Sequence, residues 1–388
     1  MTAPSVLLPL ADGSLKWYEP TGNPVDPPAD DRGFKSRVVY AAPHVVADPR
    51  QSSASSVSLQ VDWDATLDYR GYLWSMGFGV AEAMDTAQRS MGLSWEAARE
   101  LIGRSLAAAP DRHDAIACGA GTDQLDPTEA SLDAVVAAYE EQCGYVESAG
   151  GRVVLMASRA LARAARGPDD YLAVYDKVMS QLTRPVTLHW LGEPFDPALA
   201  GYWGSHDVGR STETFLTLVR TQAEKVEGVK VSLLDKTLEI ELRDRLPGGV
   251  RVYTGDDFNY VELIRGDGDR HSDALLGIFD AIAPVAAVAL RALDEGDEDR
   301  FESLLSPTVE LSRQIFSTPT RFYKTGLVFL AYLNGHQSHF RMVGGLESAR
   351  SVVHLAETFA LADRAGLLRD HEVACARMRA FLATAGIE

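Results

Sequence analysis

The sequence predicts an α/β protein, namely a (β/α)8 TIM barrel with an N-terminal hairpin extension and a C-terminal helical extension. Between residues 37 and 295, eight short apolar runs alternate with amphipathic helical stretches. This alternation is typical of a parallel sheet, and eight repeats favour closure of the sheet into a barrel. After residue 295 the pattern stays helical. We therefore expect three parts, residues 1–36, 37–295 and 296–388.

The composition indicates a globular cytoplasmic protein with no affinity for nucleic acid or membranes. Of 388 residues, 46% are hydrophobic and 24% are charged, and the formal net charge is -18. A field of this sign repels polyanions, although one pocket can still bind a small anion. The scattered cysteines Cys118, Cys143 and Cys375 fit a reducing compartment. The longest apolar stretch, residues 274–290, is broken by a charge and a proline and is too short for a membrane span.

The first 36 residues are predicted to form a separate extension. Apolar runs at residues 5–10 and 15–18 flank Asp12-Gly13, a dipeptide typical of hairpin turns. A segment rich in proline and aspartate follows up to Arg32 and is interpreted as a linker. We expect the hairpin to act as a lid or plug rather than as part of the catalytic body.

The barrel itself is defined by its predicted strands and by one clear helix start. The strands are residues 37–42, 78–84, 115–118, 152–157, 185–190, 228–232, 250–254 and 274–279. The helix after the third strand is predicted to start at Asp126, a capping residue followed by Pro127 at the first helical position. Its apolar residues recur at helical spacing, and it ends near Gly150.

The C-terminal extension is predicted to be entirely helical. Helical patterns cover residues 301–305, 308–316, 322–333, 348–365 and 370–384. The run at 322–333 is apolar except for Lys324. Helices with more apolar surface than one barrel covers often pack against a partner subunit. We therefore expect a homo-oligomer, a dimer or a tetramer.

A lysine lies in the middle of the sixth predicted strand. Because side chains alternate along a strand, Lys230 shares its face with Gly228 and Ser232, while Val229 and Val231 point to the other face. A desolvated lysine has a lowered pKa, and such amines form Schiff bases with carbonyl compounds. A lysine near a strand end can instead extend its ammonium group to solvent, so this interpretation needs support from the rest of the chain.

Polar side chains follow most of the predicted strands, at the end where TIM-barrel enzymes carry their catalytic groups. In chain order these are His44, Asp85, Thr86, Thr122, Asp123, Ser158, Arg159, His189, Asp256 and Asp257. Each alone could instead cap a helix or fix a loop, Asp257 in particular. Together with Lys230 they predict a polar site at one end of the barrel.

Six segments, which follow one another along the chain in the family's order, resemble the dihydrodipicolinate synthase and N-acetylneuraminate lyase family of Schiff-base aldolases. Residues 228–232 (Gly-Val-Lys-Val-Ser) resemble the strand with the imine-forming lysine. Residues 85–89 (Asp-Thr-Ala-Gln-Arg) occupy the place of a Gly-Thr-Thr-Gly-Glu loop that holds the substrate carboxylate. The other similar segments are residues 117–122, 185–190, 254–257 and 276–284. The resemblance covers roughly residues 37–335, and it implies a TIM barrel with a lysine-dependent lyase activity, a small carbonyl substrate and no cofactor.

The departures from the family lie in the predicted site. His189 replaces a tyrosine of the family's proton relay, and the family's tyrosine after strand four and arginine after strand five are missing. Imidazole exchanges protons near neutral pH, so His189 is the predicted general acid and base. Either Arg159 or Arg89 is predicted to hold a carboxylate. The resemblance then implies catalytic roles for Lys230, His189 and Thr86, and substrate contacts from Asp85, Arg159, Ser232, Asp256, Asp257 and His44.

Two other functions are compatible with the sequence. A metal-dependent isomerase or class II type aldolase would draw its ligands from His44, Glu82, Asp85, His189, Asp256 and Asp257, although no local ligand spacing supports a metal site. A non-catalytic binding or regulatory barrel would keep Lys230 for structural reasons. The leading prediction is a Schiff-base lyase, aldolase or dehydratase from a divergent branch of the family. It acts through Lys230, without a metal, on a 2-oxo acid or a keto-sugar-like metabolite.

Overall fold

The computed structural model describes residues 4–27, 29–51, 60–128 and 130–387, and it contains a closed barrel of eight parallel strands. The strand order is β10-β3-β4-β5-β6-β7-β8-β9, so each strand pairs with its neighbours in the sequence and β10 closes the barrel on β3. The predicted fold class is confirmed. The barrel strands are β3 (Val39–Ala41), β4 (Gly79–Glu82), β5 (Ile116–Ala120), β6 (Arg152–Leu155), β7 (Val186–Leu191), β8 (Val226–Ser232), β9 (Arg251–Thr254) and β10 (Asp273–Leu276).

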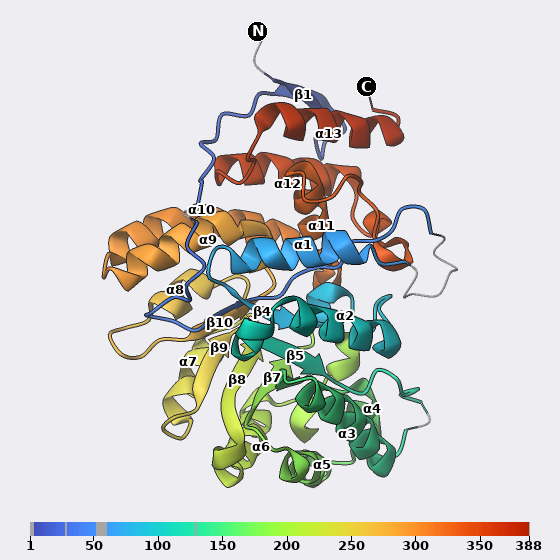
Figure 1. Cartoon of the computed structure of the whole chain (residues 1–388), viewed down its shortest axis with the longest axis vertical. Coiled ribbons are helices and arrows are strands. Elements are labelled where there is room, and N and C mark those ends of the chain that lie inside the picture. Colours follow the sequence, from blue (N-terminus) through green and yellow to red (C-terminus); the bar gives the residue numbers. More distant parts are fainter. Residues whose placement is uncertain (1–3, 28, 52–59, 129, 388) are drawn as a thin grey trace.

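Helices surround the barrel and continue beyond its last strand (Figure 1). The helices between strands are α1 (Trp63–Trp74), α2 (Trp95–Ala108), α3 (Leu132–Ser148), α4 (Arg159–Ala164), α5 (Pro168–Gln181), α6 (Val208–Thr221), α7 (Lys236–Arg245) and α8 (Tyr260–Arg265). Those after β10 are α9 (Phe279–Asp294), α10 (Glu298–Ile315), α11 (Tyr323–Leu333), α12 (Val352–Arg364) and α13 (His371–Thr384). Within the described residues, no helix combines the length and the apolar character needed to cross a bilayer.

Alternate strand positions face the inside of the barrel and form a core of their own. This inner core consists of Tyr40, Ala42, Ala81, Met84, Ala117, Val154, Met156, Tyr253 and Leu275. Residues at the intervening positions, such as Val80 and Val229, belong to the larger core between strands and helices. Because paired residues of a parallel sheet point to the same side, the register of each strand shows which polar side chains enter the barrel.

Two predicted helix boundaries are wrong. Helix α3 begins at Leu132, where the Ser131 hydroxyl accepts a hydrogen bond from the backbone N–H of Ala134. Asp126, the predicted cap, instead accepts from the backbone N–H of Thr128 at 2.8 Å and forms a local turn. The segments predicted at 301–305 and 308–316 are one helix, because α10 continues through Pro307.

The C-terminal helices pack on one another and on α9, the helix that follows the last barrel strand. Helix α10 contacts α9 and α12, and α11 contacts α9, α10, α12 and α13. Every residue of α11 is buried within the single chain. The apolar run at 322–333 therefore needs no partner subunit to cover it, and this reason for expecting an oligomer is wrong.

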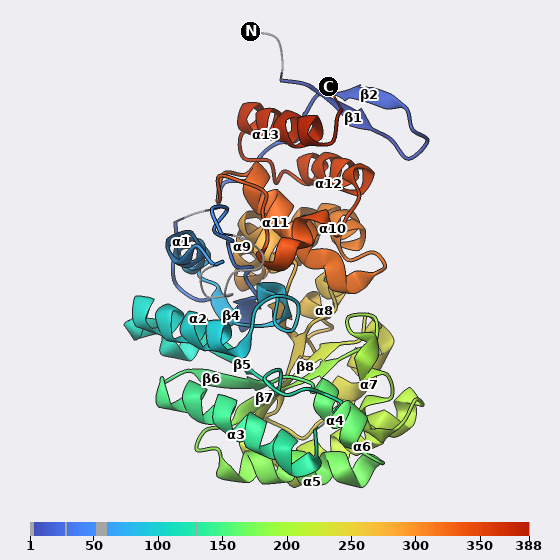
Figure 2. The same cartoon turned by 90° about the vertical axis from the view of Figure 1, so that its right-hand side faces the viewer.

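The N-terminal hairpin is present, but it lies away from the mouth of the barrel. Strands β1 (Val6–Pro9) and β2 (Leu15–Tyr18) pair antiparallel, and β1 packs on α12 and α13. The hairpin and both chain ends lie at the opposite end of the molecule from α3 to α6 (Figure 2). The next segment is held by the buried Asp363, which accepts hydrogen bonds from the Tyr18 hydroxyl and from the backbone N–H groups of Thr21 and Gly22. The hairpin was expected to act as a lid, but in the structure it binds the N-terminal segment to the C-terminal helices.

Candidate active site

Lys230 and His189 lie side by side inside the barrel, as the sequence predicts. Lys230 of β8 is paired with His189 of β7 on one side and with Tyr253 of β9 on the other. Tyr253 belongs to the inner core, so its register partners share that face. Only 7% of Lys230 and 1% of His189 is exposed.

The Lys230 amine is buried without a partner of opposite charge in direct contact. In the described part of the chain its Nζ forms neither a hydrogen bond nor an ion pair. Burial lowers the pKa of Lys230, and the negative charges of Asp85 and Asp257 oppose this effect. Gly255 provides the space for the side chain, since a Cβ at that position would lie 2.9 Å from Lys230 Cε. A buried amine with a lowered pKa is the form of lysine that can act as a nucleophile near neutral pH.

His189 is positioned by Ser232, the last residue of β8. The His189 Nε2 lies 3.1 Å from the Ser232 hydroxyl, while Nδ1 has no partner among the described residues. Burial lowers the pKa of His189 well below its usual value, and the nearby Lys230 lowers it further. The imidazole is therefore neutral and has one ring nitrogen free for a proton or a ligand. Ser232, which was predicted to bind substrate, here orients the histidine.

The pKa of Asp257 is raised, so its carboxyl group is neutral over a wider pH range than that of an ordinary aspartate. Its Oδ1 accepts a hydrogen bond from the backbone N–H of Ile278 at 2.9 Å, so Asp257 also fixes the turn before α9. Burial raises the pKa of Asp257 to about 7, although the Ile278 hydrogen bond and Lys230 favour the charged form. A carboxyl group with this pKa can both donate and accept a proton near neutral pH.

Thr86 is joined to a tyrosine that sequence reasoning missed. The Thr86 hydroxyl lies 2.9 Å from the hydroxyl of Tyr323 at the start of α11, and both residues are buried. The Tyr323 ring stacks on Phe316 with centroids 4.4 Å apart. Burial raises the pKa of Tyr323 well above its usual value, and the charge of Asp85 adds to this. Tyr323 thus brings a neutral phenol from the C-terminal helices to the end of the barrel.

A cavity of about 210 Å³ opens beside this group, and we call it the outer cavity. Its lining includes two residues predicted to contact substrate, Asp85 and Arg159, and three other predicted strand-end residues, Thr122, Asp123 and Ser158. Asp196, Tyr323 and Lys324 line it as well. Lys230 and His189 are not part of the lining. Asp85 connects the two regions, because it faces the cavity and also favours the charged form of Lys230.

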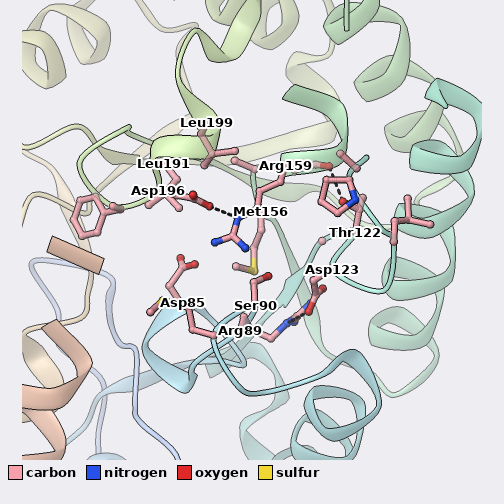
Figure 3. Close-up of a pocket in the computed structure, with 18 of the residues that line it drawn as sticks. Asp85, Arg89, Ser90, Thr122, Asp123, Met156, Arg159, Leu191, Asp196 and Leu199 are labelled. Atoms are coloured by element: carbon pink, nitrogen blue, oxygen red, sulfur yellow. Dashed lines mark hydrogen bonds and ion pairs between the residues drawn. The ribbon is translucent and has the colours of Figure 1, made fainter. Parts of the chain in front are cut away.

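The two arginines of the outer cavity have different roles. Figure 3 shows the guanidinium of Arg159 in the middle of the cavity, held by Asp196 through an Nε to Oδ2 contact of 2.6 Å. Arg89 is instead fully engaged, because it pairs with Asp123, donates to the Gly119 carbonyl at 3.0 Å and to Gln142 at 2.8 Å. Of the two predicted carboxylate binders, only Arg159 has groups left for a ligand.

Two other predicted substrate contacts are occupied by structural interactions. Asp256 accepts hydrogen bonds from the backbone N–H groups of Phe258 and Asn259 at 2.8 and 3.1 Å, and from the Asn259 amide at 2.7 Å. His44 Nδ1 contacts Asp280 at 2.8 Å, and its ring lies 4.5 Å from that of Tyr69, outside the outer cavity. Both side chains hold the loops at the strand ends.

The described residues contain no cluster of three or more histidine, cysteine or acidic side chains that could hold a metal ion. The candidate ligands named from the sequence are dispersed: Glu82, for example, pairs with Arg70 at 2.9 Å in a fully buried position. The chemistry available at this end of the barrel is therefore that of an amine, an imidazole, carboxyl groups and hydroxyls.

Comparison with solved structures confirms the predicted resemblance at the level of the fold. YagE from E. coli, a prophage protein of the dihydrodipicolinic acid synthase family in complex with pyruvate, superposes with a TM-score of 0.66 and 14% identity, over 85% of this chain and 99% of that chain. Dihydrodipicolinate synthase from Aquifex aeolicus gives 0.64 and 13%, over 86% and 99%. The enzyme DapA-2 from Bacillus anthracis gives 0.59 and 16%, over 84% and 98%.

The chain matches a model of one protein family, but it matches no curated protein. The model of the family DUF993, described as a protein of unknown function, matches residues 6–387. No curated protein matches significantly. The chain therefore belongs to the DUF993 family, and it has the fold of the dihydrodipicolinate synthases.

Proposed function

We propose that this protein is a Schiff-base lyase, either an aldolase or a dehydratase, in which Lys230 forms an imine with a 2-oxo acid or a keto-sugar-like metabolite. The observation that carries the proposal is the environment of Lys230. The amine is buried inside the barrel beside a neutral imidazole, with no ion-pair partner in the described residues, and its pKa is lowered. The fold shared with dihydrodipicolinate synthases supports a lyase of this general kind.

The proposed chemistry starts with the neutral form of Lys230. Its nitrogen attacks the carbonyl carbon, the carbonyl oxygen takes up protons and leaves as water, and an imine remains. The protonated imine accepts the electron pair that is released when the neighbouring C–C bond breaks, or when a C–H bond breaks before hydroxide leaves. Hydrolysis by water then restores the lysine. Each step needs groups that take up and release protons at defined atoms.

Three groups at this end of the barrel suit these proton transfers. His189 is neutral and keeps Nδ1 free, so it can accept a hydrogen bond from the attacking amine or from a substrate hydroxyl, while its lowered pKa makes it a weaker base than an ordinary histidine. Asp257, with its pKa raised to about 7, can supply a proton to the leaving oxygen. The Thr86–Tyr323 hydroxyl pair can relay a proton between the inside of the barrel, where Lys230 lies, and the outer cavity.

The metal-dependent alternative has no observation in its favour, because the candidate ligands do not gather in the described part of the chain.

Assembly as a dimer or tetramer stays a prediction, and it now depends on other residues than those of α11. Leu15 and Trp17 of β2 are 49% and 66% exposed, and Val373 of α13 is 39% exposed. Light scattering at micromolar concentration measures the assembly directly.

Trapping with borohydride tests the proposed function. The full chain is incubated with carbonyl compounds such as pyruvate, hydroxypyruvate and keto sugars, and sodium borohydride then reduces any imine to a stable amine. We expect a mass increase on the peptide that contains Lys230. Lys230→Ala and Lys230→Arg should show no adduct, since neither side chain provides the amine. Lys177→Ala, which removes an exposed lysine on α5, serves as the control. Turnover that survives in Lys230→Arg, or an adduct on another lysine alone, would contradict the proposal.

A further inference from the structure

Besides Lys230, which lies outside the cavity lining, the barrel end has a second buried lysine, Lys324, and this one does line the outer cavity. Lys324, in the first turn of α11, is 3% exposed. Its Nζ donates to the Arg321 carbonyl at 3.2 Å and contacts the Met91 sulfur at 3.4 Å. Among the described residues no carboxylate forms an ion pair with it. The Nζ also lies 4.6 Å from the centroid of the Tyr323 ring. A buried ammonium group that faces a cavity and has no partner of opposite charge in contact is well placed to bind an anionic ligand.

Arg159 provides a second cation in the same cavity. Asp196 holds its Nε, and within the described residues its two terminal nitrogens have no hydrogen bond. Figure 3 shows this guanidinium projecting toward Asp85. Burial lowers the pKa of Lys324 to about 8, Asp85 opposes the effect, and the positive charge of Arg159 adds to it. Both cations line the same cavity, so an anion bound between them would be attracted by both.

The other charges of the cavity do not compete for such an anion. Arg89 and Asp123 neutralise each other, and both also bond to Gln142. Asp196 pairs with Arg159 through Nε and also favours the charged form of Lys324. Asp85 forms no ion pair among the described residues, and it acts on both Lys230 and Lys324. A negative group bound close to Asp85 would be repelled, whereas a hydroxyl could donate to it. From the inside of the barrel outward, the charged groups are therefore the Lys230 amine, the Asp85 carboxylate and the cations Lys324 and Arg159, of which Arg159 is bound to Asp196 on one side.

We propose that Lys324 and Arg159 form a subsite for a carboxylate or phosphate group at the end of the substrate that is remote from the reacting carbonyl. The assignment of the carbonyl end rests on the proposed function of Lys230, whereas the anion subsite stands on its own geometry. The substrate class is then a hydroxylated aldehyde or ketone with a distal anionic group. Lys324 offers an ammonium point charge and Arg159 a planar pair of donors, a combination that suits both anions.

Binding of simple anions tests the subsite without any imine chemistry. Isothermal titration of the full chain with inorganic phosphate, and separately with succinate, shows which anion is preferred. We expect Lys324→Met and Arg159→Gln each to weaken binding by about tenfold or more, since each loses a charge-assisted hydrogen bond. Lys177→Met and Arg163→Gln, which replace exposed residues of α5 and α4, should bind as the wild type does. If Lys324→Met fails to fold, Arg159→Gln decides, because its side chain is 36% exposed and its loss leaves no cavity in the core.

Two further measurements separate this proposal from the Schiff-base proposal. Lys230→Ala should still bind the preferred anion, because Lys230 lies outside the cavity lining. With borohydride, glyceraldehyde 3-phosphate should label Lys230 more than glyceraldehyde does at equal concentration, and Lys324→Met should remove the difference. Anion binding without any labelling would contradict the imine but support the subsite. Binding of neither anion, or equal binding to wild type, Lys324→Met and Arg159→Gln, would overturn the subsite.

Discussion

The hydroxyl of Tyr323 lies 2.9 Å from the hydroxyl of Thr86, and this contact joins the C-terminal helices to the chemistry of the barrel. Thr86 lies in the short 3-10 helix Asp85–Ala87 that follows β4, whereas Tyr323 begins α11. Tyr323 also lines the outer cavity, and the charge of Asp85 acts on it. The C-terminal helices thus contribute side chains to the candidate site and do more than cover the barrel.

We expect Tyr323→Phe to reduce catalysis far more than stability. Loss of the hydroxyl removes one hydrogen bond, worth about 1 kcal/mol of unfolding free energy. If the pair relays protons, the rate of imine formation should fall by about 100-fold. The rate is measured by quenching with borohydride, using the carbonyl compound that labels Lys230 best.

A matched variant controls for the loss of a buried tyrosine hydroxyl. Tyr175→Phe removes a hydroxyl that lies 2.9 Å from that of Tyr202, away from the cavity lining. It should lower stability to a similar degree and leave the labelling rate unchanged. Equal rates for wild type and Tyr323→Phe would mean that Tyr323 only packs against Thr86.

The sequence predicts the barrel well because each strand carries its own local signal. Short apolar runs between turn residues located all eight strands, and alternation along β8 placed Lys230 on the inner face with Ser232. The start of α3 was misplaced because Asp126 and Pro127 form a turn, and the hydrogen bond that caps the helix comes from Ser131. Local patterns identify elements, but they do not choose between two nearby caps of similar strength.

The site is less predictable because its partners are distant in the sequence. Thr86 and Tyr323 are 237 residues apart, and nothing in an apolar helix pattern indicates that its first turn faces the barrel. Lys324 was the only charge in that run, and this was the one signal that could have marked it. Asp256 and His44 follow strands as catalytic residues do, yet the Asp256 carboxylate and the Nδ1 of His44 bond to nearby groups, while the buried Nε2 of His44 has no partner among the described residues. Only the folded structure shows which polar groups remain available.

The pH dependence of imine formation should follow the lowered pKa of Lys230. Because burial favours the neutral amine, the labelling rate should reach its plateau below pH 10.5, the usual pKa of lysine. Asp85 stabilises the ammonium form, so Asp85→Asn should lower the pKa further and shift the profile to lower pH. Labelling rates between pH 5 and 10 measure both profiles. An Asp85→Asn profile displaced to higher pH would contradict this account.

Stability measurements should separate the two arginines of the outer cavity. Arg89 is buried and bonds to Asp123, Gln142 and two backbone carbonyls, so Arg89→Gln leaves several polar groups unpaired. We expect it to lose about 3–5 kcal/mol of unfolding free energy in urea denaturation. Arg159→Gln breaks one ion pair of a partly exposed side chain and should change stability by about 1 kcal/mol or less. Similar losses for both variants would show that Arg159 has a structural role as well.

Glu239 should make the protein less stable as the pH rises from about 5 to about 8. Its carboxyl group is buried on α7 and bonds to the hydroxyls of Ser272 at 2.7 Å and Thr254 at 3.0 Å. Burial raises the pKa of Glu239 from 4.5 to about 8, while these hydrogen bonds oppose the shift. Between the two values the folded protein keeps a proton that the unfolded chain has lost, so each pH unit costs roughly 1.4 kcal/mol of stability at most. The stabilising contribution is complete below the unfolded pKa and is lost as the pH approaches the folded pKa.

The isosteric variant Glu239→Gln tests this directly, because its amide does not titrate and can still bond to both hydroxyls. Urea denaturation at pH 5 and pH 8 should show a difference in unfolding free energy between Glu239→Gln and wild type that grows in favour of the variant as the pH rises. Glu241→Gln, at an exposed position of the same helix, should follow the wild type at both pH values. A Glu239→Gln protein whose stability falls between pH 5 and 8 as steeply as that of the wild type would show that other groups cause the loss.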